Sequence, residues 1–144
     1  VRDSASGVIH RWDSGEVTRW FDGAEVAGAN GLVVDGGRLV ATTMGSESLV
    51  VIDLETADIE RIVDLRPFGG DGITADGRGA FLVSDYRGRL LRVTPNGDCD
   101  LLIDTRETGI SLTDFAYAPA IDLVAVPTLR GGGLLGYRLG IAIE

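Results

Sequence analysis

A unit of four short strands recurs about every 40 residues along this 144-residue chain, and this repeat predicts an all-β fold of the β-propeller type. Two glycines near the start of apolar segments, Gly31 and Gly72, are 41 residues apart, and Asp114 takes the corresponding place 42 residues further on. A turn and a nearly continuous apolar run follow each of them, as expected of strands buried on both faces. No 3.6-residue helical periodicity is visible. We therefore expect about three four-stranded blades.

The first 22 residues fit the outer half of one blade. Residues 8–12 match the third strand of the repeat, and residues 17–22 match the fourth. The fourth strands would then end at Asp22, Asp64 and Asp104, which are separated by 42 and 40 residues. Residues 1–22 are therefore expected to supply only the outer strands of a blade.

Two complete blades and a shorter last blade follow this segment. We expect blades at residues 28–64 and 69–104, and a last blade with three strands at residues 110–139. Residues 94–97, with Pro followed by Asn-Gly, are a hairpin turn because Asn and Gly tolerate positive φ. The strands expected in these blades are residues 29–35, 39–42, 49–52, 59–64, 70–76, 81–84, 90–93, 99–104, 112–118, 123–126 and 134–138.

This number of blades is too small for a closed ring. A propeller closes with about 4–8 blades, and three alone would leave apolar faces open to water. We therefore expect a missing N-terminal half, or a second copy of the chain, to close the ring.

The composition excludes several classes of partner. Thirteen Lys and Arg residues stand against 22 Asp and Glu, so the net charge of −9 would repel a phosphate backbone and predicts no nucleic-acid partner. No apolar run approaches the roughly 20 residues of a membrane helix, so no membrane partner is expected. The single cysteine, Cys99, alternates with Leu101 and Ile103, which predicts a small buried side chain on an inward strand face.

Four segments carry a resemblance to a known family. They are residues 29–35 (Ala-Asn-Gly-Leu-Val-Val-Asp), 71–76 (Asp-Gly-Ile-Thr-Ala-Asp), 83–90 (Val-Ser-Asp-Tyr-Arg-Gly-Arg-Leu) and 126–128 (Val-Pro-Thr). With these segments the chain resembles the C-terminal half of the SMP-30/gluconolactonase-like (regucalcin-type) six-bladed β-propellers. The resemblance implies a metal-dependent hydrolase of small sugar lactones or related esters, present here as an incomplete half.

The same resemblance implies a metal site. In that family an Asn and an Asp, each just before the Gly of successive inner strands, bind a divalent cation on the propeller axis. Matched residue by residue, these ligands are Asn30 and Asp71, with Asp71 also the catalytic residue. The expected cofactor is Ca²⁺, with Mg²⁺, Mn²⁺ or Zn²⁺ as alternatives. The family's third protein ligand, a Glu of the first blade, has no counterpart in this chain.

The geometry of a propeller supports a polar site independently. Its innermost strands run beside the axis, so equivalent residues of successive blades converge on one channel. Thr113 stands at the same point as Asn30 and Asp71, with Asp114 one place further on, and we assign Thr113 and Asp114 to binding a small-molecule substrate. Carboxylate and amide oxygens suit a hard cation. Asp71 could accept a proton from an attacking water.

The same residues also fit other roles, and the repeat fits other kinds of propeller. Asn-Gly and Asp-Gly are also the commonest turn dipeptides, so Asn30 and Asp71 could serve turns alone. Asp85, aligned with Asp3, Thr42 and Thr128, is expected to cap a loop backbone. The whole chain could instead be a non-catalytic NHL-like propeller that binds a peptide or sugar, or a strictosidine-synthase-like propeller.

Overall fold

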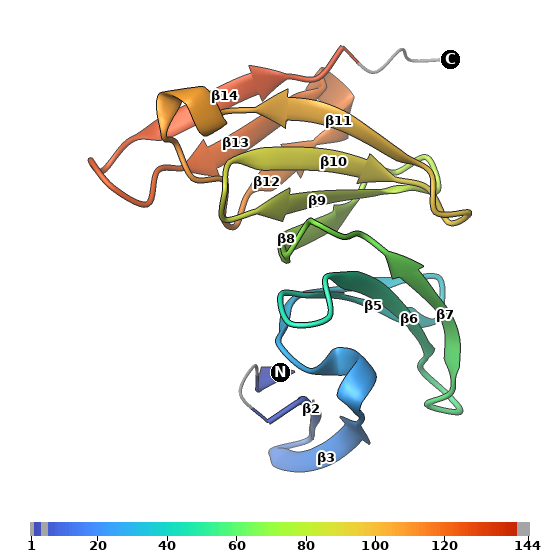
Figure 1. The fold of residues 1–144 in the computed structure, drawn as a ribbon. Helices are drawn as coiled ribbons and strands as arrows, with labels where there is room; N and C mark the ends of the chain where they lie inside the picture. Colours follow the sequence, from blue (N-terminus) through green and yellow to red (C-terminus); the bar gives the residue numbers. More distant parts are fainter. Residues whose placement is uncertain (1, 4–5, 141–144) are drawn as a thin grey trace. The chain divides into compact units, whose positions relative to one another are not determined.

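The computed structural model describes residues 2–3 and 6–140, and it is built from β-strands. The chain forms two compact units, residues 1–71 and 72–144. Four antiparallel sheets are present, with strand orders β1-β2-β3, β4-β5-β6-β7, β8-β9-β10-β11 and β12-β13-β14 (Figure 1). Within the described residues, no helix is long and apolar enough to cross a membrane.

The first unit contains two sheets and the beginning of a third. In the first sheet β2 pairs with β1 on one side and β3 on the other. The second sheet is a four-stranded meander in which every neighbouring pair is antiparallel. The strands are β1 (Arg2–Asp3), β2 (Val8–Asp13), β3 (Glu16–Asp22), β4 (Ala29–Asp35), β5 (Arg38–Thr43), β6 (Ser48–Asp53) and β7 (Ile59–Asp64), with the short helix η1 (Ala24–Val26) between β3 and β4.

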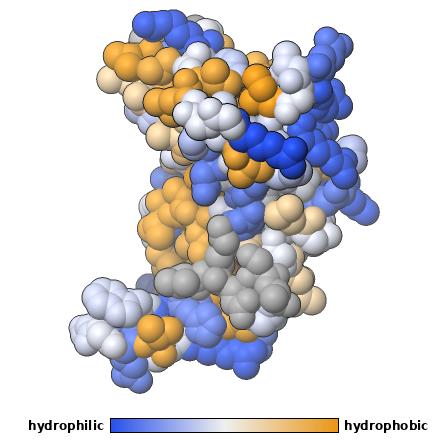
Figure 2. Space-filling view, turned by 90° about the vertical axis from the view of Figure 1, so that its left-hand side faces the viewer, coloured by the Kyte–Doolittle hydropathy of each residue, from blue (hydrophilic) through white to orange (hydrophobic). Residues whose placement is uncertain are grey.

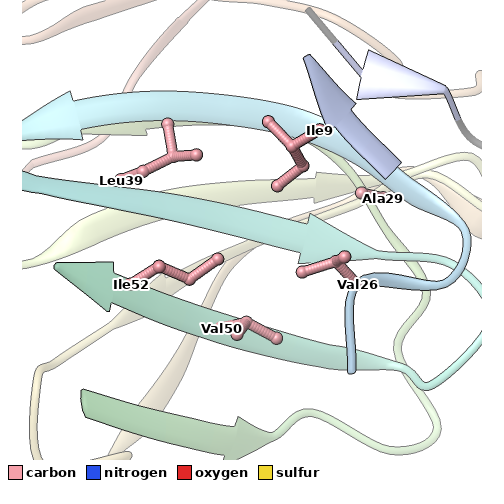
Figure 3. Close-up of a cluster of buried hydrophobic side chains, with 6 residues drawn as sticks. All are labelled: Ile9, Val26, Ala29, Leu39, Val50 and Ile52. Carbon is pink, nitrogen blue, oxygen red and sulfur yellow. The ribbon is translucent and has the colours of Figure 1, made fainter. Parts of the chain in front are cut away.

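An apolar cluster joins the two sheets of the first unit. Ile9 of β2 packs with Ala29 of β4 and Ile52 of β6 at exposures of 2% or less (Figure 3). Val26 of η1 is fully buried in the same cluster, which holds the connection between the sheets in place. Burying a side chain of this size stabilises the fold by about 1.5–3 kcal/mol. Ala29 therefore anchors the start of β4 next to Asn30.

The second unit repeats this plan. Strand β8 (Gly70–Ala75) spans the boundary between the units and forms the inner edge of a four-stranded sheet. Leu82, Leu90 and Val124 are fully or almost fully buried between this sheet and the last one. The remaining elements are β9 (Phe81–Asp85), β10 (Arg89–Val93), β11 (Cys99–Asp104), η2 (Arg106–Thr108), β12 (Ala116–Ala118), η3 (Pro119–Ile121), β13 (Leu123–Pro127) and β14 (Leu134–Arg138).

Most of the strand predictions are confirmed. The fourth strands β3, β7 and β11 end at Asp22, Asp64 and Asp104, as the repeat predicted. The first sheet contains more than the outer strands expected of residues 1–22, because β1 adds two residues of a further strand beside β2. The apolar runs predicted these strands well because a buried strand is a short, nearly continuous apolar run bounded by turn residues.

The first strand of the last blade is shorter than predicted. Residues 112–118 were expected to form it, but β12 covers only Ala116–Ala118, and Asp114 lies at a bend. The corresponding position in β8 is Gly72, where an added Cβ would lie 2.9 Å from the Thr113 carbonyl oxygen and 3.0 Å from Ser84 Oγ. The last blade therefore has an acidic side chain at the place where β8 requires a glycine, and its first strand begins two residues later.

The prediction that Cys99 faces inward is wrong. Cys99 is exposed, and Leu101 on the same strand is 52% exposed. Strand β11 is the outer edge of its sheet, and its register against β10 shifts between Leu90 and Leu91. That shift changes which side chains point to each face, because one residue of slippage reverses a strand's alternation.

Candidate functional site

A β-bulge at the start of β4 sets the position of Asn30. Ala29 pairs with Thr43 and Leu32 pairs with Ala41, so two residues of β4 stand opposite Thr42 alone. Such a bulge adds a local bend and redirects the side chain at that point. Asn30 is consequently half-buried at the end of the sheet, just after the buried Ala29.

The structure brings Asn30 and Asp71 together. The Asn30 side-chain Nδ2 donates a hydrogen bond of 2.5 Å to Asp71 Oδ1, although the two residues are 41 positions apart. Nδ2 also lies 3.3 Å from the sulfur of Met44. Both residues lie within strands, Asn30 in β4 and Asp71 in β8, and the glycines that follow them have no positive φ. The interpretation of these dipeptides as turns is therefore wrong.

The hydroxyl group of Thr42 holds this pair in place. Thr42 is fully buried, and its Oγ1 accepts a hydrogen bond of 3.1 Å from the Gly31 amide. The same oxygen donates to the backbone carbonyl of Asp71 at 3.3 Å. A Cβ added at Gly70 would lie only 2.6 Å from Thr42 Cβ, so glycine is required for this close approach. We refer to this arrangement as the hydroxyl bridge.

A second hydroxyl bridge occurs in the other unit. Ser84 Oγ accepts a hydrogen bond of 3.0 Å from the Gly72 amide and donates one to the backbone carbonyl of Thr113. Ser84 is fully buried and lies 42 residues after Thr42. The Thr113 carbonyl thus takes the part that the Asp71 carbonyl plays in the first unit. The internal repeat predicts that Thr113 is equivalent to Asp71, and the hydrogen bond from Ser84 to the Thr113 carbonyl agrees with that position.

Loop capping falls one residue after the bridge. Thr43, rather than the predicted Thr42, closes its loop: its Oγ1 accepts from the Ser48 amide at 3.0 Å. Asp85 accepts from the Arg89 amide at 2.8 Å and Thr128 from the Gly133 amide at 2.8 Å, which confirms the capping role predicted for these two residues. The side chain of Asp3 lies outside the described residues. The sequence predicted loop capping alone for Thr42, so it did not predict the bridge.

The other two predicted site residues, Thr113 and Asp114, differ in exposure. Thr113 is half-buried, and Asp114 is exposed at the bend before β12. The last blade has Val126 where Thr42 and Ser84 stand, 42 residues after Ser84. A hydroxyl group at this register of the second strand was therefore a readable signal for the bridge, and its loss in the last blade was readable as well.

Asn30 and Asp71 are the residues here that could hold a cation. Their carboxylate and amide oxygens are hard donors of the type that Ca²⁺ prefers, but Ca²⁺ takes 6–8 oxygen ligands. Among residues 2–3 and 6–140, no group of three or more His, Cys, Asp and Glu side chains could hold a metal ion. Asn30 and Asp71 could therefore supply only part of the ligands that Ca²⁺ takes.

Carboxylates elsewhere in the sheets are paired with arginine. Hydrogen bonds from the Arg66 side chain, and then from its backbone amide, lower the pKa of Asp64 to about 2. Arg106 does the same for Asp104, at the corresponding strand end. Inside the second unit, the buried Asp76 forms an ion pair with Arg92, with 2.8 Å between Asp76 Oδ2 and Arg92 Nε. At Asp71, by contrast, the side-chain partner described above is the amide of Asn30.

Solved structures similar to this chain are β-propellers. Virginiamycin B lyase from Staphylococcus aureus is 16% identical, with a TM-score of 0.65 over 94% of this chain and 50% of the lyase. The computationally designed Ika4 protein is 15% identical, with a TM-score of 0.66 over 94% of this chain and 82% of that one. The β-propeller domain of Myceliophteria thermophila Cps50 (Swd1) is 19% identical, with a TM-score of 0.60 over 78% of this chain and 38% of that one.

These likenesses confirm the predicted fold class, a partial β-propeller. The chain spans about half the length of the lyase. No family model matches the chain, and no curated protein matches it. The comparisons therefore support a propeller without assigning it to one family of propellers.

Proposed function

We propose that this chain is part of a metal-dependent hydrolase of small lactones or related esters, similar to the SMP-30/gluconolactonase-like propellers. The observation that carries the proposal is the 2.5 Å contact between Asn30 and Asp71, two polar residues from different sheets. A hydroxyl bridge positions their backbones, and neither side chain is fully buried.

In this proposal Asn30 and Asp71 hold a divalent cation, Ca²⁺ or alternatively Mg²⁺, Mn²⁺ or Zn²⁺. When bound, such a cation supplies Lewis-acid polarisation of the substrate carbonyl. Asn30 would hold the cation through its amide oxygen after half a turn of the terminal amide, which gives up the hydrogen bond from Nδ2 to Asp71. Asp71 would accept the proton of the attacking water at a carboxylate oxygen. Thr113 and Asp114 bind the substrate.

Cation binding by the full chain tests the proposal directly. Isothermal titration with CaCl₂ should show weak binding, and Asp71→Asn should weaken it at least about tenfold because a charged ligand is lost. Asp35→Asn is the matched control, since Asp35 lies at the other end of β4 and carries the same charge. Equal Ca²⁺ affinity in Asp71→Asn and the parent chain would overturn the proposal.

Turnover is expected to depend on further blades. Two protein ligands make a weak site, so a monomer of these 144 residues should hydrolyse D-glucono-1,5-lactone slowly, even with CaCl₂ present. Light scattering with and without Ca²⁺ would show whether a second copy or a longer parent chain supplies the remaining blades. Rapid lactone hydrolysis by the monomer would contradict this expectation. Unchanged lactone hydrolysis in Asp71→Asn would contradict the catalytic role of Asp71.

A further inference from the structure

A pocket of about 240 Å³ opens between three loops of the second unit. The turn between β9 and β10 supplies Tyr86, the segment after η2 supplies Ile110 and Ser111, and the loop between β13 and β14 supplies Leu129 and Arg130. Both of these strand connections lie at the same end of their sheets (Figure 1). Hydrophobic and polar residues stand side by side on this face, in the upper part of Figure 2.

Hydrogen bonds at their bases preorganise the three loops. The buried Thr105 has its Oγ1 2.6 Å from the Ile110 carbonyl and 2.9 Å from the Gly88 carbonyl, and its single hydroxyl hydrogen can be donated to either one. Asp85 caps the first turn, and Thr128 closes the β13–β14 loop through the Gly133 amide. A pocket with such fixed walls loses little conformational freedom when a ligand binds.

The charge of the pocket contrasts with that of the chain. The chain has a net charge of −9, yet the pocket is lined by one cation, Arg130, and by no carboxylate. Among the described residues Arg130 has no ion-pair or hydrogen-bond partner, and the same holds for the side chains of Tyr86 and Ser111. The pocket is thus lined by a guanidinium and two hydroxyl-bearing side chains without such partners, beside the apolar Ile110 and Leu129.

We infer that this pocket binds a small organic carboxylate. A guanidinium matches a carboxylate through two parallel hydrogen bonds, and one cation neutralises one negative charge. The Tyr86 ring, Ile110 and Leu129, the first and last of which are 48% and 55% exposed, offer apolar contact to an organic body that inorganic phosphate lacks. This inference uses none of the residues of the proposed hydrolase site, so each can fail without the other.

The test is a titration of the full, ¹⁵N-labelled chain with sodium benzoate, followed by two-dimensional NMR. Benzoate should shift the amide signals of Gly109, Ser111 and Gly131 saturably. Arg130→Gln should weaken binding at least about tenfold, because a charge-assisted hydrogen bond is lost. Arg87→Gln is the matched control: Arg87 is exposed, adjoins Tyr86 and does not line the pocket. It should change the affinity less than twofold.

Two further ligands decide the chemistry. Benzamide has the same shape without the charge and should bind at least tenfold more weakly than benzoate. Inorganic phosphate should also bind more weakly. Equal binding of benzamide, equal binding of phosphate, the same loss in Arg87→Gln as in Arg130→Gln, or no saturable benzoate shift in a folded chain would each overturn the inference.

Discussion

Removing the Thr42 hydroxyl should destabilise the first unit and loosen the Asn30–Asp71 pair. The substitution Thr42→Val keeps the shape and the branching at Cβ and deletes only the oxygen. That oxygen is the acceptor of the Gly31 amide at 3.1 Å and a donor to the Asp71 carbonyl at 3.3 Å. Thr42 is fully buried, so water cannot replace the lost partner without a rearrangement.

The magnitude follows from the orphaned amide. A buried N–H left without an acceptor costs about 1–3 kcal/mol. With a urea m-value of about 2 kcal/mol/M, the midpoint of unfolding should fall by about 0.5–1.5 M. Thr42→Ser retains the hydroxyl and should recover most of this loss. The corresponding Ser84→Ala should have the same effect in the second unit, where Gly72 loses its acceptor.

Tryptophan fluorescence is the suitable probe because both tryptophans, Trp12 and Trp20, lie in the first unit, and Trp20 packs against its core. The control is Thr18→Val, in which an exposed hydroxyl with a 3.5 Å contact is removed. Its midpoint should change within the equivalent of about 0.5 kcal/mol. If Thr42→Val unfolds at the same urea concentration as Thr18→Val, the reasoning about the hydroxyl bridge is refuted.

Three further predictions concern other parts of the chain. Gly88→Ala should cost about 1–3 kcal/mol more in urea unfolding than Gly79→Ala: both have positive φ, but an added Cβ at Gly88 would lie 2.5 Å from backbone and side-chain oxygens, and at Gly79 it would meet nothing within 4 Å. Iodoacetamide should alkylate Cys99 in the native state, and Asp100→Asn should speed the reaction, because burial first and then the neighbouring carboxylates raise the thiol pKa. Asp64→Asn should lower the melting temperature at pH 7. The folded state lowers the pKa of Asp64 from 3.8 to about 2, so the charged carboxylate stabilises the fold fully only above pH 3.8. The difference in melting temperature should therefore shrink as the pH falls from about 4 toward 2.

The sequence predicted strands far better than it predicted side-chain roles. Apolar runs, turn residues and the repeat placed β4, β7, β11 and β14 at their observed bounds. These signals are local and redundant, since each blade reports the same pattern again. The orientation of Cys99 was missed because it depends on the register shift between β10 and β11, and no residue type marks that shift. In addition, β11 is an edge strand, and the alternation of apolar and polar residues does not show which of its faces is exposed.

The sequence predicted that Asn30 and Asp71 occupy equivalent positions in successive blades, but it did not predict the hydrogen bond between them. Equal spacing placed the two residues at equivalent points of successive blades. Their side chains meet because the bulge opposite Thr42 redirects Asn30, and a bulge depends on the pairing of two strands rather than on either sequence. The one-residue error in the loop caps has the same origin: Thr42 and Thr43 are alike in chemistry, and only the pairing separates bridge from cap.

The last blade departs from the other two at the residues of the hydroxyl bridge. In the first bridge the glycine amide reaches a hydroxyl 11 residues later, and in the second 12 residues later. In the second bridge a Cβ added at Gly72 would lie 3.0 Å from the bridging oxygen, so glycine is required there. The last blade has Asp114 and Val126 at these two places, so it has neither the glycine nor the hydroxyl. Its first strand begins only at Ala116. A glycine followed at that distance by a buried hydroxyl therefore distinguishes a full inner strand from a shortened one within this chain.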